Sequence, residues 1–302
     1  MQMTRPGFEG RRRETGRGYK LMKRTCIFIV ALLLAAAPAL SMAAQADNPF
    51  VSPRGSCNYI SGTTVIVTIF VDDPYHQWKW FDRSEDATSY FRVHSRLETA
   101  ANWLESQVAR YGGRANIVWD WHDRPYLYNW YTSKNNMRSS QYTYSELRSY
   151  ITENIPLDKI KEYYGADNVL FLALYNQDIN EKSRGVSYPL DFWEYAGTNE
   201  AYEILWIMVE DSGLTVSAAG LAHEIMHCFG AVDLYEGSDF TTDAYLRHLR
   251  AINSNDIMYS IDYRDPDHIG ESFSDLDAYY MGLRSYSADR EQYNLRRSSF
   301  DR

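Results

Sequence analysis

Two uninterrupted apolar runs constrain the fold of this 302-residue chain more than any other feature. Residues 63–71 (TTVIVTIFV) and 168–175 (NVLFLALY) are short, closely bounded and rich in β-branched or large apolar side chains. Such runs are typical of buried strands. Residues 202–209 (YEILWIMV) form another run of this kind, so we expect these segments to supply the central strands of a sheet.

Segments with helical spacing separate these strands. In residues 84–111 apolar side chains recur every three or four positions, and the pattern ends at Gly112-Gly113, as a helix does. Strands that alternate with helices indicate an α/β fold with a mixed, mostly parallel sheet. No repeat or linker follows the leader, so we expect one catalytic domain over residues 47–302. The other predicted elements are a strand at 116–121, a loop at 122–145, a helix around 143–154 and an edge strand at 185–189.

The first 46 residues have the pattern of an export leader. Lys23 and Arg24 precede an apolar run, residues 26–40, and small residues suited to cleavage after Ala46 or Ala43 follow it. We therefore expect a cleaved signal peptide and a secreted protein, extracellular or periplasmic, that does not contact the membrane afterwards. The alternative is an uncleaved membrane anchor, because a run of about 20 residues spans a bilayer.

Charge is divided unevenly between the leader and the rest of the chain. Residues 1–46 hold eight Lys/Arg and two Asp/Glu, out of 31 and 40 in the whole chain. The remaining residues therefore carry 23 basic and 38 acidic side chains, a net charge of −15. Because so acidic a body is repelled by phosphate backbones, we do not expect nucleic acid as a partner.

Two cysteines remain after the expected cleavage, Cys57 and Cys228. An even pair in an oxidising compartment favours a disulfide, although the sequence does not give the Cα separation that the bond requires. The alternatives are two separate thiols, or a Cys57 thiol that lies near a metal and blocks it in a latent enzyme.

The strongest chemical signal is residues 217–235, SAAGLAHEIMHCFGAVDLY. His223 and His227 are four positions apart, so on a helix both imidazoles project from one face and can bind one zinc ion. Glu224 is expected beside the open position of the metal, where a carboxylate can act as general base. Gly230 can end the helix in a left-handed turn that brings Asp233 back as third ligand. The alternative is a helix with two ordinary histidines and a surface glutamate.

This HExxHxxGxxD pattern resembles the extended zinc signature of the metzincin clan of metallopeptidases, in the variant with Asp as third ligand. It is also similar to secreted bacterial peptidases of the immune-inhibitor-A type and to snapalysin-like enzymes. The resemblance, which has motif support over residues 215–283, implies a zincin fold of the α+β kind. That fold combines a mixed sheet with an active-site helix and an irregular C-terminal subdomain.

The resemblance extends to a second landmark, a methionine in a tight turn beneath the zinc. Met258, in the sequence Asn255-Asp256-Ile257-Met258-Tyr259, matches this Met-turn. The resemblance also implies a closing helix within residues 274–283. Some members bind the metal through a Tyr two residues after the Met; here Ser260 occupies that position, so we do not expect a fifth ligand.

Several further features have two interpretations. Tyr235 and Tyr259 could hydrogen-bond the oxyanion or be structural. The acidic stretch 262–277 could hold calcium, but it lacks ordered ligand spacing and is typical of a solvated loop. The Trp/Tyr-rich segment 117–131 could line a substrate groove, bind glycan or pack against the core. The remaining histidines lack metal-ligand spacing to one another: His76, His94, His122, His248 and His268.

Together these features predict a monomeric, secreted zinc-dependent endopeptidase. We expect its protein or peptide substrate to lie extended along an edge strand above the zinc. One alternative is a zinc amide hydrolase that acts on a cell-wall or glycan substrate. The other is a binding or adhesion module that keeps the fold without turnover; Glu224 argues against it, because zinc binding alone does not require that residue.

Overall fold

The computed structural model describes residues 60–74, 77–78, 84–120, 124–135, 137, 140–175, 188–190, 203–208, 210–211, 214–238, 240–262 and 264–295. All of these belong to one compact unit of the chain, residues 48–302. Within these ranges no helix has both the length and the apolar character that crossing a bilayer requires. The expected leader, Cys57, His76 and His122 lie outside the described residues, so the predictions about them stay predictions.

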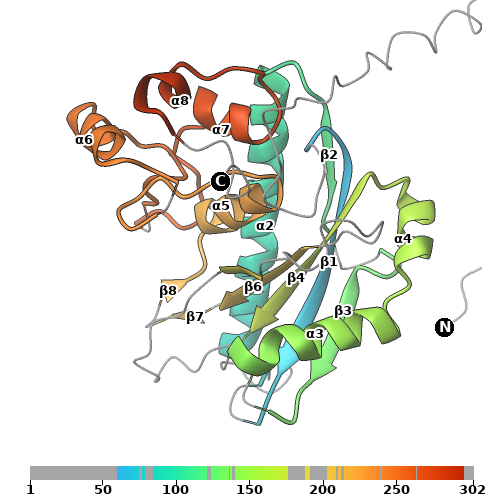
Figure 1. Cartoon of the computed structure of the whole chain (residues 1–302). Coiled ribbons are helices and arrows are strands. Elements are labelled where there is room, and N and C mark those ends of the chain that lie inside the picture. The colour runs from blue at the N-terminus through green and yellow to red at the C-terminus, as the bar shows by residue number, and fades with distance from the viewer. Residues whose placement is uncertain are drawn as a thin grey trace, which may run out of the picture. The chain divides into compact units, whose positions relative to one another are not determined.

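The unit is built on an open, mostly parallel sheet (Figure 1). Its strands are β1 (Gly62–Asp72), β2 (Ala115–Val118), β3 (Tyr128–Thr132), β4 (Asn168–Tyr175), β5 (Tyr188–Leu190) and β6 (Glu203–Met208). The strand order is β2-β1-β4-β6-β5, with β3 also paired to β1. All pairs are parallel except β5 with β6. The predicted mixture of helices with a mostly parallel sheet is therefore confirmed. Strands β7 (Glu210–Asp211) and β8 (Leu214–Thr215) form a separate antiparallel pair.

The two apolar runs form adjacent central strands. Every residue of β4 is buried, as are eight consecutive residues of β1. Strands of a parallel sheet are covered on both faces by the crossover helices, which explains why these two show no polar alternation. Their register places Val67 opposite Phe171 and Phe70 opposite Leu174, so large apolar side chains fill the centre of the sheet.

Helices cover the two faces of the sheet. The first is α2 (Ser84–Arg110), which connects β1 to β2; α3 (Ser140–Asn154) and α4 (Leu157–Tyr164) connect β3 to β4. These crossovers run in opposite directions across the sheet, and right-handed connections then place the helices on opposite faces. Figure 1 shows α2 on one side and α3 with α4 on the other.

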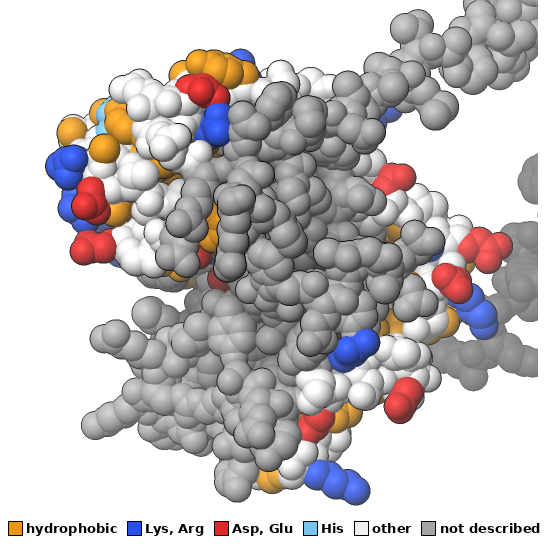
Figure 2. Space-filling model, in the orientation of Figure 1, with side chains coloured by type: hydrophobic (Ala, Val, Ile, Leu, Met, Phe, Trp, Pro, Cys, Tyr) orange, Lys and Arg blue, Asp and Glu red, His pale blue; other side chains and the backbone are white. Residues whose placement is uncertain are grey.

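After the sheet, the chain becomes irregular. Its helices are α5 (Ala218–Cys228), α6 (Asp243–Ala251), α7 (Asp275–Tyr280) and α8 (Ala288–Tyr293). Each begins at a Ser or Thr whose hydroxyl accepts a hydrogen bond from a backbone N–H three positions on. Acidic and basic side chains are interspersed on the part of this region visible in Figure 2, as on an ordinary solvated surface.

Several sequence predictions need correction. The expected loop at 122–145 contains β3, and the helix expected around 143–154 already begins at Ser140. None of the side chains of β3 is buried, so the strand lacks the apolar signal that marks β1 and β4. Helices α4, α6 and α8 were not predicted. The edge strand expected at 185–189 overlaps β5, and its first three residues lie outside the described part of the chain. A helix, α7, lies within residues 274–283, where the closing helix was expected.

Candidate metal centre

The two histidines of the HExxH sequence lie on α5. The Ser217 hydroxyl caps this helix by accepting from the Gly220 N–H at 2.9 Å. All of its residues except Gly220 are buried, and it packs against α2, β5 and β6. The helix is thus held in the interior, and its histidines are fixed with it.

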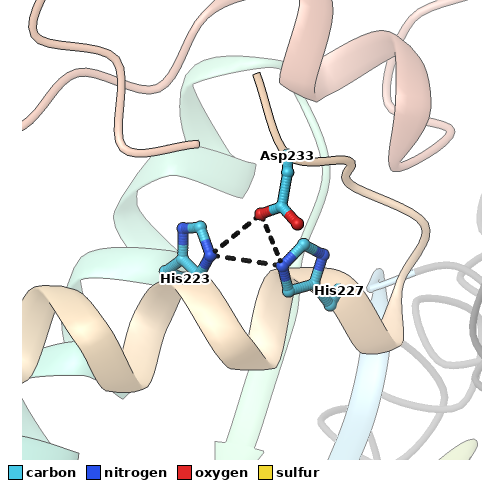
Figure 3. A group of neighbouring side chains, drawn as sticks. All are labelled: His223, His227 and Asp233. Carbon is cyan, nitrogen blue, oxygen red and sulfur yellow. Dashed lines mark hydrogen bonds and ion pairs between the residues drawn. The ribbon is translucent and has the colours of Figure 1, made fainter. Parts of the chain in front are cut away.

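His223, His227 and Asp233 converge on one point (Figure 3). The two Nε2 atoms are 3.2 Å apart. Asp233 Oδ1 lies 3.3 Å from Nε2 of His223 and 3.1 Å from Nε2 of His227. Among the described residues, this is the group of His, Cys, Asp and Glu side chains placed to hold a metal ion. The structure therefore brings together the three residues that the sequence pattern predicted as ligands.

Hydrogen bonds on the far side of each ring fix which nitrogen faces this point. Nδ1 of His223 lies 3.0 Å from Ile257 O, and Nδ1 of His227 lies 2.9 Å from Ala231 O. A carbonyl oxygen only accepts, so each Nδ1 carries the hydrogen and each neutral ring turns the lone pair of Nε2 toward Asp233. Carbonyls that orient metal-binding histidines in this way are typical of zinc sites.

The donor set and its dimensions fit zinc. Two imidazole nitrogens and one carboxylate oxygen are a common catalytic zinc ligand set. Ligand atoms at tetrahedral positions about 2.0–2.1 Å from an ion are about 3.3–3.4 Å apart, and the separations here are 3.1–3.3 Å. Three electron-pair donors that face one another this closely repel unless a cation or a proton lies between them. We conclude that these residues could hold a metal ion.

The charges of the site shift the pKa values of His223 and Asp233 so that the charged form of each is favoured. Burial lowers the pKa of His223, but its hydrogen bond to Asp233 and the charges of Glu224 and Asp233 outweigh burial and raise it overall. Burial raises the pKa of Asp233, yet the two histidines outweigh burial and hold it well below the ordinary value. Without a metal, the cluster therefore favours a positive charge among its rings.

A sharp turn after α5 brings Asp233 back to the histidines. Gly230 has φ 99°, a conformation that side-chain-bearing residues rarely adopt, and its N–H donates to His227 O at 3.0 Å. The Ala231 N–H donates to Met226 O at 3.1 Å, which satisfies another carbonyl at the helix end. The expected role of Gly230 as the turn residue is confirmed.

Glu224 is buried beside the cluster. Its side chain is 8% exposed, and its Oε2 is a buried oxygen without a hydrogen-bond partner among the described residues. Burial raises the pKa of Glu224, while His227 and His223 partly offset that effect. A buried carboxylate without a partner is costly unless it serves a function, and one with a raised pKa is better matched to taking up a proton near neutral pH.

The segment around Met258 forms a tight turn next to the cluster. The Asp256 carboxylate accepts from the Met258 N–H at 2.8 Å, and Asp256 O accepts from the N–H groups of Tyr259 and Ser260. The two carbonyls at its centre contact the cluster and its flanking residue: Ile257 O accepts from His223, and Met258 O accepts from the Leu234 N–H at 2.8 Å. The Met258 side chain is fully buried.

The other predicted site residues are scattered around this centre. Tyr235 is 46% exposed two residues after Asp233, and Tyr259 is half-buried in the turn after Met258. Their oxyanion roles stay predictions. Cys228, at the end of α5, is fully buried, with Sγ 3.7 Å from Glu224 O. Because Cys57 lies outside the described residues, the disulfide is not tested.

The acidic stretch 262–277 contributes no metal-binding group among the described residues. Four of its carboxylates pair with basic side chains instead: Asp262 with Arg264, Asp265 with His268, Asp267 with Arg96, and Asp275 with Arg284. The stretch also contains a buried residue that the sequence analysis did not single out, Asp277, which is a hydrogen-bond partner of Asp256. Its sequence signal is Ser274-x-x-Asp277, a capping box at the start of α7.

No family model and no curated protein matches this chain. The metzincin resemblance therefore stays a prediction. The features that bear on function are therefore those of the site itself: two oriented imidazoles, one carboxylate at tetrahedral separation, and one buried carboxylate beside them.

Proposed function

We propose that this protein is a secreted zinc-dependent endopeptidase with a metzincin-like zincin fold. His223, His227 and Asp233 would hold the zinc ion, and Glu224 would act as general base. The observation that carries the proposal is Glu224, whose buried Oε2 has no hydrogen-bond partner among the described residues. It lies on the same helix turn as two histidines whose Nε2 lone pairs face Asp233.

When bound, a zinc ion supplies Lewis acidity, which polarises a carbonyl and lowers the pKa of water. The chain supplies the proton transfer. Glu224 takes a proton from the attacking water and delivers it to the leaving amine as the peptide bond breaks. Its raised pKa supports this double role, since it must both accept and release a proton.

The sheet supports a peptide as substrate. Strand β5 is the edge strand on one side of the sheet that the described residues form. It contacts α5, the helix that bears the two histidines. It is also the antiparallel strand of the sheet. An edge strand offers unpaired backbone groups to an extended peptide, so a substrate added there would lie next to the metal-bearing helix.

A casein cleavage assay tests the proposal. We expect the zinc-loaded full-length protein to cleave unstructured casein, a chelator to stop cleavage, and added zinc to restore it. A His227→Ala variant purified in parallel should be inactive, which excludes a contaminating protease as the source of activity.

The outcome that would overturn an endopeptidase is an absence of casein cleavage by zinc-loaded protein. If that protein instead released amide-linked fragments from cell-wall material, the alternative hydrolase would be correct. If it bound zinc and cleaved neither, the protein would be a binding module that keeps the site.

A further inference from the structure

Two carboxyl groups face each other in the interior behind the Met258 turn. Asp256 lies in that turn and Asp277 on α7, and their side chains are 2% and 1% exposed. The two carboxyl groups are hydrogen-bond partners. Two ionised carboxylates cannot form a hydrogen bond, and in a buried site they repel strongly unless one of them holds a proton.

The surrounding donors show which carboxyl group holds the proton. Asp256 accepts from the Met258 N–H at 2.8 Å, and the Ser274 hydroxyl is a hydrogen-bond partner of both carboxyl groups. Asp277 Oδ2 accepts from the Ser274 N–H at 2.9 Å, but Asp277 Oδ1 is buried and has no donor within the described part of the chain. A proton shared with Asp256 therefore belongs on Oδ1, the Asp277 oxygen that no donor reaches within the described residues. Burial, together with the charge of Asp256, raises the pKa of Asp277 well above its usual range.

This pair is linked to the metal centre through one short stretch of backbone. Asp256 fixes the position of the Met258 N–H. The carbonyls of the same turn bind the His223 ring at 3.0 Å and the Leu234 N–H, one residue after Asp233, at 2.8 Å. The Ile257 N–H in turn donates to Ser272 O at 3.0 Å, just before α7 begins. A displacement of Asp256 would therefore move the groups that orient two of the three proposed ligands.

We propose that Asp256 and Asp277 share one proton and act together as the positioning pair of the metal centre, holding the Ile257–Met258 turn against His223 and Asp233. The inference rests on the proposed metal site but does not depend on the reaction that the site performs. The pair positions the proposed ligands and takes no part in the reaction, because neither carboxyl group touches the point on which the ligands converge.

Ionisable groups on three helices, α5, α6 and α7, interact with the pair. The charge of His223 on α5 acts to lower the pKa of Asp256. The charges of both carboxyl groups raise the pKa of Tyr245 on α6. Tyr280 on α7 is affected by Asp277. Burial and these acidic charges raise the pKa values of both tyrosines, so they remain neutral at physiological pH. Of these three neighbours, His223 is the one whose charge can change there, so measurements on the pair should be made at a fixed pH.

Infrared spectroscopy tests the shared proton without any need for metal or activity. At neutral pH the full-length protein should show the carbonyl stretch of a protonated carboxylic acid, and Asp277→Asn should lose it. If the band is absent, or if Asp277→Asn leaves it unchanged, the proton is not on Asp277 and the inference fails.

Zinc affinity tests the positioning role. Asparagine reproduces a neutral acid that donates to Asp256, so Asp277→Asn should bind zinc within about threefold of wild type. Asp277→Leu has a similar volume but no donor and leaves Asp256 unsatisfied; changes behind metal ligands commonly cost about 10–100-fold in affinity. The matched control is Asp73→Asn, which alters another buried aspartate that accepts from a backbone N–H, that of Met137, at the far end of β1. It should destabilise the protein without a change in zinc affinity.

The outcomes separate this inference from the proposed function. If wild type does not bind zinc, the metal site and the proposed function both fail. If wild type binds zinc and Asp277→Leu binds it equally well in its folded state, the positioning role alone is wrong. Should Asp277→Leu not fold, a loss of more than about tenfold in Asp277→Asn would still overturn the inference, because the asparagine preserves every hydrogen bond that the pair requires.

Discussion

The sheet and the region after it are stabilised by different interactions. In β1 and β4 the side chains are almost all buried, and eight consecutive residue pairs hold the two strands in register. After residue 214 the helices have 6 to 11 residues, and side-chain to backbone hydrogen bonds fix the connections between them. Burial of apolar surface specifies the sheet, whereas a few polar contacts specify the candidate site.

The proposed function accounts for this difference. A metal centre requires its ligands at defined separations, and apolar packing alone tolerates small shifts that such a centre does not. Here individual hydrogen bonds fix the geometry of the candidate site. Examples are the bond from the Met258 N–H to the Asp256 carboxylate and the bond from the Ser238 hydroxyl to Asp233 O at 2.7 Å. Substitutions in the two regions should therefore have different consequences.

The largest effect should come from Glu224→Gln. The amide cannot accept a proton from water, so turnover of casein should fall by about 10²–10⁴, the usual range for loss of a general base. Zinc content and the unfolding temperature should stay near wild type, because the change preserves shape. Glu236→Gln is the control, since Glu236 is exposed and paired with Arg250 at 2.8 Å. Activity of Glu224→Gln within a few-fold of wild type would disprove the proposed base.

Two alanine substitutions, one beside the sheet and one beside the candidate site, compare the two regions directly. Ile160 on α4 and Met258 are both fully buried, and replacement of either by Ala should lower the free energy of unfolding by about 2–5 kcal/mol. Helix α4 packs on β1 and β4, so Ile160→Ala should not change the zinc affinity of the folded protein. Met258→Ala should also weaken zinc binding, by about 10-fold or more. Equal zinc affinities in the two variants, measured by competition with a chelating dye, would contradict the distinction between the regions.

Zinc removal should destabilise the protein, and more so at high pH. Saturating zinc at about 1,000 times its dissociation constant adds about 4 kcal/mol to the stability of a folded site. His223 has a raised pKa, so the stability that its charge contributes to the metal-free protein is fully present below about pH 6.5 and is lost as the pH rises through the raised value. Zinc must displace that proton.

The difference in unfolding temperature between zinc-loaded and metal-free protein should consequently grow as the pH rises above about 6.5. Calorimetry of both forms at several pH values would measure it. A difference that is constant with pH, or that shrinks as the pH rises, would show that His223 is not a ligand.

The sequence predicted the sheet and the grouping of the three proposed ligands well, each for its own reason. Buried strands leave continuous apolar runs, so the ranges expected for β1 and β4 agree with the structure to within one residue at each end. The ligands follow from helix geometry, because residues four apart share a face. The placement of Asp233 depended on Gly230, whose positive φ confirms the expected turn.

What the sequence did not predict is specified by contacts between distant residues. Strand β3 has no buried side chain, and its position depends on pairing with β1, some 60 residues earlier. The pairing of Asp256 with Asp277 depends on where α7 packs, which no local pattern encodes. The carbonyls of Ala231 and Ile257 that orient the histidines are backbone groups, so their role carries no residue-type signal.

The smallest effect should come from Met258→Leu. Leucine nearly conserves the volume of methionine, so the variant should lose less than about 1.5 kcal/mol of stability and retain its zinc. Chemical denaturation combined with metal analysis would measure both. Loss of zinc in Met258→Leu, with the fold intact, would mean that the thioether contributes more than shape.

The central claim is that His223, His227 and Asp233 together bind one zinc ion, and anomalous diffraction at the zinc absorption edge tests it most directly. The account predicts a single strong peak about 2.0–2.2 Å from the Nε2 atoms of both histidines and from a carboxylate oxygen of Asp233. A zinc peak bound by other residues, or one that leaves the Asp233 carboxylate beyond bonding distance, would contradict it.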